Sequence, residues 1–372
     1  MRVKALEPNP KILYELVHIT IRVGNMFARK AALKGASLML GFAAALLVST
    51  TTLAATAGAK TSPAPGESIN QNLGDTDYGV CRGIDPACYH NWPRAKTTEY
   101  RALLVTRTAG PRHANLGPAL GPGLNPSLAE GNVVQREMVR LAAANGFKLD
   151  YTEDLNILQR LSGYNAVIYF STSRDMLDDG AKTALRQYMR AGGGFVGIHN
   201  AFGSLYNWPY YEGLLGNANY YDHGPERTGD VVVLEHKDAS TKALPDRFAF
   251  KDEWYNLVPF PTHVRFLATI DEKSWTPVAQ REGGFPPGGP PGPAGAPRIP
   301  QLPSVVGNNP GHGSFHPVAW CQYYDGGRAW LTTLGHDAAG FGPDETFAGA
   351  GAFQKLIVGG IKSSMGMEPF CQ

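Results

Sequence analysis

The chain has 372 residues, of which 43% are hydrophobic and 18% charged, enough apolar material for one large domain or two small ones. Seven Lys or Arg and two Asp or Glu residues lie in residues 1–57, so the remainder carries 27 basic and 30 acidic residues and a formal net charge of −3 instead of +2. No basic tail or stripe is left to neutralise phosphate groups, which argues against nucleic acid as a partner.

The first 57 residues have the order of segments that is typical of a secretory signal peptide. Basic residues precede an apolar run at 38–48, and small residues follow it with an Ala55-x-Ala57 cleavage site. The run is too short to span a bilayer comfortably, so we expect a periplasmic or secreted protein with no membrane span after cleavage. The alternative is an uncleaved N-terminal anchor. Met26 begins an ordinary basic n-region and is a candidate for the true start of the chain.

Four cysteines fit an oxidising compartment. Cys81 and Cys88 flank a short polar loop, and we expect them to form a disulfide. Cys321 and Cys371 either pair as well or leave Cys321 as a free buried thiol on a core strand. The surrounding segment 58–98 is rich in Gly, Pro, Ser and Thr and is expected to be a linker and irregular lead-in.

Apolar runs of strand length alternate with amphipathic helical stretches from residue 99 onward. Up to residue 198, the expected strands are 101–107, 147–151, 165–170 and 195–198, and the expected helices are 133–145 and 178–191. Later strands are expected at 230–235, 264–270, 318–324 and 328–333, with a hairpin turn at 325–327 and a closing helix at 347–362. The Pro/Gly-dense segment 283–310 is expected to be a surface insertion. This pattern predicts an α/β domain over 99–366, with a mostly parallel sheet, helices on both faces and a strand-rich C-terminal part.

Five segments, in this order, resemble sequence blocks of the ThuA-like family, named for a trehalose-utilisation protein. They are Leu104–His113, Ala191–Asn200, Asp252–Tyr255, His316–Trp320 and Gly326–His336. The resemblance runs from about Arg101 to Gly360 and implies the class I glutamine amidotransferase-like fold, which is flavodoxin-like. It also implies a link to trehalose or other keto-sugar catabolism.

Amidotransferases of this fold carry a catalytic Cys on the sharp turn after the strand that here ends at Ile198. This chain has His199 at that place, followed by Asn200. Without the thiol, the Cys-His-Glu mechanism of glutamine hydrolysis is not available, and we expect no amidotransferase activity.

Histidines gather instead at the carboxyl ends of the expected strands. His113, His199 and His336 each follow a strand, and loops can add His223 and Glu253. Open α/β sheets bind their ligands in the crevice beyond these strand ends, so we expect the five side chains to share one crevice.

We assign the leading catalytic roles to His199 and His336, with Glu253 as their carboxylate partner in acid/base chemistry on a carbohydrate or keto-sugar derivative. The substrate-binding candidates are Asn200, Trp208, Tyr255, His113 and His223, because aromatic rings suit the apolar face of a pyranose. The same imidazoles and carboxylate suit a divalent metal such as zinc or manganese, although no metal-binding spacing motif is present. The rival hypothesis is a non-catalytic sugar-binding or scaffold protein of the cell envelope.

Overall fold

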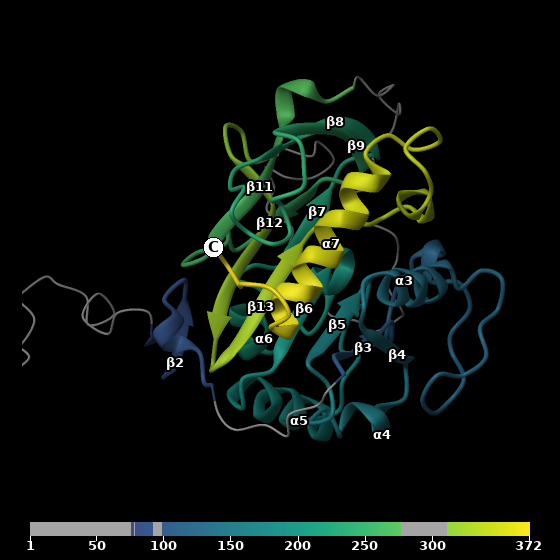
Figure 1. Cartoon of the computed structure of the whole chain (residues 1–372), viewed down its shortest axis with the longest axis vertical. Coiled ribbons are helices and arrows are strands. Elements are labelled where there is room, and N and C mark those ends of the chain that lie inside the picture. The colour runs from purple at the N-terminus through teal and green to yellow at the C-terminus, as the bar shows by residue number, and fades with distance from the viewer. Residues whose placement is uncertain (1–75, 78, 92–98, 277–310) are drawn as a thin grey trace, which may run out of the picture. The chain divides into compact units, whose positions relative to one another are not determined.

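The computed structural model describes residues 76–77, 79–91, 99–276 and 311–372, and an 11-stranded mixed sheet runs through them (Figure 1). Its strands are β1 (Thr76–Asp77), β2 (Val80–Gly83), β3 (Arg101–Val105), β4 (Lys148–Thr152), β5 (Ala166–Phe170), β6 (Gly194–Ile198), β8 (Arg227–Val233), β9 (Arg247–Asp252), β11 (Arg265–Asp271), β12 (His316–Tyr324) and β13 (Gly327–Thr332). Two further strands, β7 (Tyr220–His223) and β10 (Tyr255–Leu257), form a small antiparallel sheet of their own.

The sheet has a parallel half and an antiparallel half. The strand order is β4-β3-β5-β6-β13-β12-β11-β8-β9, and β2 pairs with β12 beside this path. The first five strands are mutually parallel, and all later pairings are antiparallel. The hairpin between β12 and β13 closes at Asp325 and Gly326, both of which have positive φ. The predicted α/β fold, with a parallel core and a strand-rich C-terminal part, is confirmed.

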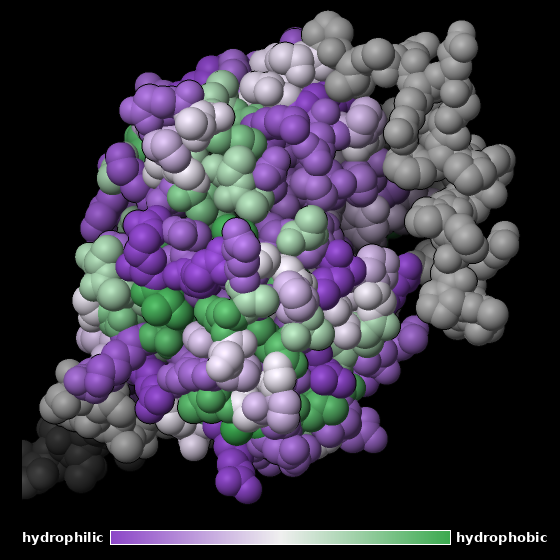
Figure 2. All heavy atoms as spheres, turned by 90° about the vertical axis from the view of Figure 1, so that its right-hand side faces the viewer, coloured by the Kyte–Doolittle hydropathy of each residue, from purple (hydrophilic) through white to green (hydrophobic). Residues whose placement is uncertain are grey.

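Helices cover both faces of the parallel half. They are α3 (Val133–Ala144), α4 (Leu155–Leu158), α5 (Asp179–Arg190), α6 (Pro209–Leu214) and α7 (Ala350–Met365). One core cluster contains the buried residues of α3 and α7, and a second contains those of α4, α5 and α6. On the α3 side of the molecule, hydrophobic residues are interspersed with hydrophilic ones (Figure 2).

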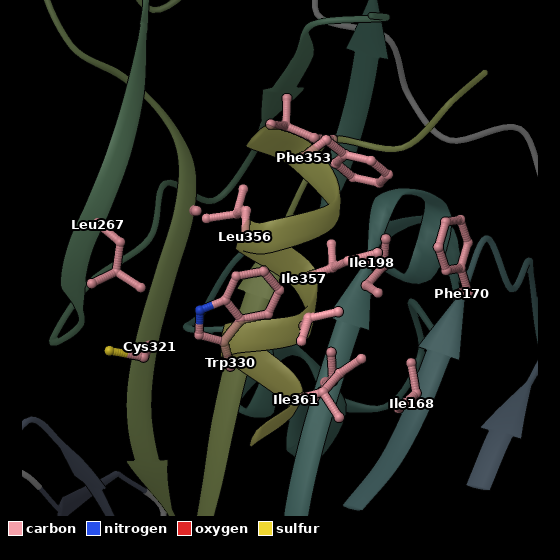
Figure 3. Packing of buried hydrophobic residues seen from close by; sticks show 14 of the residues in the cluster. Ile168, Phe170, Ile198, Leu267, Cys321, Trp330, Phe353, Leu356, Ile357 and Ile361 are labelled. Atoms are coloured by element: carbon pink, nitrogen blue, oxygen red, sulfur yellow. The ribbon is translucent and has the colours of Figure 1, made fainter. Parts of the chain in front are cut away.

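The first core cluster is packed between α7 and the sheet (Figure 3). Ile357 and Ile361 of the helix are fully buried with Ile198 of β6, and burial of each such aliphatic side chain contributes about 1.5–3 kcal/mol. Gly360 allows the close approach of α7, because a Cβ atom there would lie 2.2 Å from the ring of Trp330. This packing fixes α7 against β13, the strand that leads into the loop of His336.

Two disulfides lie within the described residues. The predicted Cys81–Cys88 bond is confirmed. Cys321 is bonded to Cys371, which decides the question left open by the sequence in favour of a second disulfide. The second bond ties β12 to the segment after α7, across a sequence separation of 50 residues.

The remaining differences from prediction concern short elements and the ends of the chain. The sequence did not indicate α4, α6, β7, β9 or β10, nor β1 and β2, which lie in the segment expected to be an irregular lead-in. The other strands and α-helices differ from their predicted bounds by a few residues. The proposed signal-peptide region 1–57, most of the lead-in 58–98 and the insertion 283–310 lie outside the described residues. Within the described ranges, no helix is both long enough and apolar enough to cross a membrane.

Candidate functional site

The carboxyl ends of the parallel strands bring three histidines together. His113 lies in the loop after β3, where it caps the short 3₁₀ helix Ala114–Leu116. His199 follows β6 directly and has a left-handed backbone (φ 52°), so the chain turns sharply out of the sheet at this residue. His336 lies in the loop after β13. The three ring centroids are 4.7–5.4 Å apart, although the residues are more than 80 positions apart in sequence.

His199 is completely buried, and its contacts define its tautomer. Nδ1 donates a hydrogen bond to the carbonyl oxygen of Thr333 at 2.8 Å. The lone pair of Nε2 therefore faces the site, where Nε2 lies 2.9 Å from the hydroxyl of Tyr255 and 3.1 Å from Nε2 of His113. Burial lowers the pKa of His199 well below its usual value, and the neighbouring His113 adds to this effect. The ring is accordingly a neutral base.

Glu253 is the carboxylate of the site, just after β9. Its Oε2 atom lies 3.0 Å from Nδ1 of His336, 3.8 Å from Nε2 of His199 and 4.0 Å from Nε2 of His113, and its Oε1 atom lies 3.5 Å from Nε2 of His223. Burial opposes ionisation of Glu253, but the four surrounding imidazoles outweigh burial and hold its pKa well below the usual range. The carboxylate is thus ionised among the imidazoles.

Two acidic residues that the sequence analysis did not single out hold His336 and Glu253 in place. Oε1 of Glu226 lies 2.9 Å from Nε2 of His336, and the other ring nitrogen, Nδ1, lies 3.0 Å from Oε2 of Glu253. Asp252 is buried and accepts from the backbone N–H groups of Gly335 at 2.7 Å, of His336 at 3.3 Å and of Glu253 at 2.8 Å. Burial raises the pKa of Asp252 to about 7. The one feature of the sequence that could have indicated Asp252 is its position directly before Glu253, a predicted site residue.

The floor of the site is formed by β10 and its neighbours. The ring of Tyr255 stacks on His199 at 4.6 Å between centroids, and the ring of Tyr220 lies 4.5 Å from Tyr255. The buried His316 supports β10. Its Nε2 donates to the carbonyl oxygen of Tyr255 at 2.9 Å, and its Nδ1 lies 2.8 Å from Oε1 of Glu272. His316 therefore supports the backbone of Tyr255 and does not reach the histidine cluster.

The side chains of the cluster form a donor set for a divalent metal. His113, His199, His336 and Glu253 each offer one ligand atom, and these four atoms lie within 4.8 Å of one another. Ligand atoms of a tetrahedral zinc ion are about 3.4 Å apart, which the observed spacings match with small movements. The second nitrogen of His199 is held by a carbonyl oxygen and that of His336 by Glu226, the outer contacts typical of metal-bound histidines. The residues therefore fit zinc or manganese.

Two of the predicted substrate-binding residues have other contacts. Asn200 is a buried residue of the 3₁₀ turn His199–Gly203, and its side chain donates to the carbonyl oxygen of Thr172 at 2.9 Å. Trp208 stacks on the rings of Tyr210 and Tyr211 at the start of α6. Among the described residues, the histidine cluster is joined instead by Tyr255 and His223, which were also predicted.

Comparison with known proteins places this site in a family context. A family model described as ThuA, trehalose utilisation, matches residues 101–362. No curated protein sequence matches the chain. A structure described as ThuA-like from Bacteroides uniformis is 20% identical, with a TM-score of 0.49 over 73% of this chain and 94% of that one. Another, from Parabacteroides merdae, is 15% identical, with a TM-score of 0.48 over 74% and 92%.

Proposed function

Because the chain belongs to the ThuA family, described as trehalose utilisation, we propose that its histidine crevice binds a divalent metal ion and transforms a carbohydrate or keto-sugar derivative. The family description suggests a carbohydrate-related role in general. The metal, the chemistry and the class of sugar are the parts that we propose.

One observation carries the proposal: three imidazoles and one ionised carboxylate converge from four separate loops. Bringing a carboxylate and a fully buried imidazole such as His199 out of water is unfavourable unless partners satisfy them. A non-catalytic sugar-binding surface needs hydroxyl, amide and ring contacts. It gains nothing from three imidazoles gathered around one carboxylate. The cluster therefore favours an enzyme over the rival hypothesis of a binding or scaffold protein.

The residues divide into two roles. We assign metal binding to His113, His199, His336 and Glu253, whose ligand atoms all lie within 4.8 Å of one another. A divalent cation held there would polarise a carbonyl oxygen of the sugar and lower the pKa of a water molecule. This changes the roles expected for His199, His336 and Glu253, from direct proton transfer to holding the cation.

Proton transfer then falls to the groups around the cluster. His223 lies beside Glu253, with 21% of its side chain exposed, and its Nε2 atom is 3.5 Å from Oε1 of Glu253. The hydroxyl of Tyr255 lies 2.9 Å from Nε2 of His199 and is able to donate a hydrogen bond to a ligand oxygen. The rings of Tyr220 and Tyr255 offer a surface for the apolar face of a sugar.

The location that we propose is periplasmic or extracellular. Two disulfides are compatible with an oxidising compartment, where such bonds form and persist. The basic and apolar order of residues 1–57 is the further support for export.

The function is tested with the purified protein loaded with zinc or with manganese. Trehalose and a keto derivative of trehalose are each incubated with it, and product formation is followed by proton NMR. We expect turnover of one of these sugars, with loss of at least 100-fold in the E253Q variant and no loss in E130Q, which removes an exposed carboxylate elsewhere. Equal rates in wild type and E253Q would rule out the proposed site.

A further inference from the structure

Arg174 occupies an unusual position between the loops that carry two of the site histidines. It follows β5, whose neighbours in the sheet are β3 and β6, and these lead to His113 and His199. Its N–H donates to the carbonyl oxygen of Gly203 at 2.9 Å, and its own carbonyl accepts from Leu205 at 3.0 Å. On the other side, Ala109 donates to the carbonyl oxygen of Ser173 at 2.9 Å. The residue is thus fixed at the carboxyl edge of the sheet.

The backbone of Arg174 is left-handed, with φ at 59°. This conformation costs a non-glycine residue about 1 kcal/mol or more, and Gly or Asn adopts it with less strain. Gly110 makes room for the side chain, because a Cβ atom there would lie 2.3 Å from Cγ of Arg174. The stem of Arg174 therefore lies along the loop that leads to His113. The local geometry accommodates a long side chain at a place where a small residue would fit more easily.

The charge of Arg174 is exposed and is not neutralised by an acidic side chain in the described ranges. The adjacent Asp175 pairs with Lys182 at 2.9 Å. Burial raises the pKa values of Tyr206 and Tyr220, and the positive charge of Arg174 opposes this rise in both. Tyr220 in turn packs on Tyr255 in the floor of the site. The hydroxyl of Tyr206 donates to the carbonyl oxygen of Tyr220 at 3.1 Å, so both of these tyrosines belong to the part of the fold that borders the site.

From this placement we infer that Arg174 binds an oxyanion group on the ligand, so that the site prefers a sugar carrying a carboxylate or a phosphate to its neutral counterpart. A guanidinium group presents paired N–H donors that match either group, and an unpaired one at a ligand crevice is suited to that contact. The inference rests on the proposed function, to which it adds a preference for acidic sugars over neutral ones.

The test compares the binding of three sugars to zinc-loaded protein by isothermal titration calorimetry: D-glucose, D-glucuronate and D-glucose 6-phosphate. We expect one of the two anionic sugars to bind at least tenfold more tightly than glucose, and which of them does so separates a carboxylate from a phosphate. In R174Q this preference should disappear while the affinity for glucose is unchanged. R174K should retain part of it.

The matched control is R160Q, which removes an exposed arginine just after α4 and should bind all three sugars as the wild type does. Equal affinities of the wild type for the three sugars, absence of any sugar binding, or a preference that survives in R174Q would each overturn the inference. Zinc binding is measured on the same samples. If zinc still binds in those cases, the metal site stands and only the role of Arg174 fails.

Discussion

The Nε2 atoms of His113 and His199 face each other at 3.1 Å, although β5 separates the strands that lead to them. The proton on the other nitrogen of His199 is committed to Thr333. Its Nε2 atom therefore offers a lone pair, which is satisfied either by a donated proton or by a cation between the rings. Nδ1 of His336 and Oε2 of Glu253 lie 3.0 Å apart. One ligand atom from each of these two residues lies within 4.8 Å of those of His113 and His199, which favours the cation.

Replacing Glu226 by Gln should weaken zinc binding without abolishing it. Glu226 lies 2.9 Å from Nε2 of His336, and loss of such an outer carboxylate costs about 10- to 100-fold in metal affinity. The affinity is measured by competition with a chromophoric chelator. E130Q serves as the control for the loss of one carboxylate, and an unchanged zinc affinity in E226Q would contradict this role for Glu226.

Replacing Asp252 by Ala should destabilise the fold by about 3 kcal/mol. The change leaves three backbone N–H groups without their acceptor: a buried one at Gly335 and partly buried ones at His336 and Glu253. Denaturant unfolding measures the loss. The exposed Asp175, which lies in a surface ion pair, provides the comparison, and D175A should change stability by less than about 1 kcal/mol. Similar stabilities of the two variants would refute the bracing role of Asp252.

Stability should fall in weak acid because of His312. Its Nε2 accepts from the N–H of Leu257 at 2.9 Å, and burial, together with the charge of His316, lowers its pKa to about 4, against an opposing effect of Glu272. The unfolded chain has a histidine pKa of 6.5 and binds the proton first. This contribution is therefore fully present above pH 6.5 and is lost as the pH falls toward 4.

The variant H312Q keeps an acceptor for Leu257 but does not titrate. Between pH 7.5 and pH 5 the wild type should lose about 2 kcal/mol more stability than this variant. Urea unfolding at the two pH values gives the difference, and parallel losses in the two proteins would show that His312 does not contribute.

The two disulfides should differ in their contribution to stability. Their sequence separations are 50 residues for Cys321–Cys371 and 7 for Cys81–Cys88. The chain-entropy model then gives about 4 kcal/mol for the longer loop and about 2 kcal/mol for the shorter one. Double Ala variants of each pair, compared by denaturant unfolding, should show this order. The reverse order would show that loop entropy does not dominate.

Long periodic elements and strand-end histidines could be predicted from the sequence, whereas contacts between loops could not. The apolar run of β5 and the Gly-rich entry to β6 are local signals, and they are sufficient to place His199 at a strand end. The contact of Glu226 with His336 joins residues 110 positions apart through the antiparallel half of the sheet, and no local pattern indicates it. Trp208 was expected at the site because it is aromatic and near His199 in sequence. It lies at the start of α6, however, and its ring stacks on that of Tyr210.

The most direct test of the account is a zinc titration of the chelator-treated protein. We predict one zinc ion bound per chain in the wild type, and none in H199A at concentrations that saturate the wild type, with circular dichroism showing that H199A is folded. The control H236A removes an exposed histidine that pairs with Asp246 and should bind one zinc ion. If the wild type binds neither zinc nor manganese, or if folded H199A binds zinc as the wild type does, the histidine cluster is not a metal site.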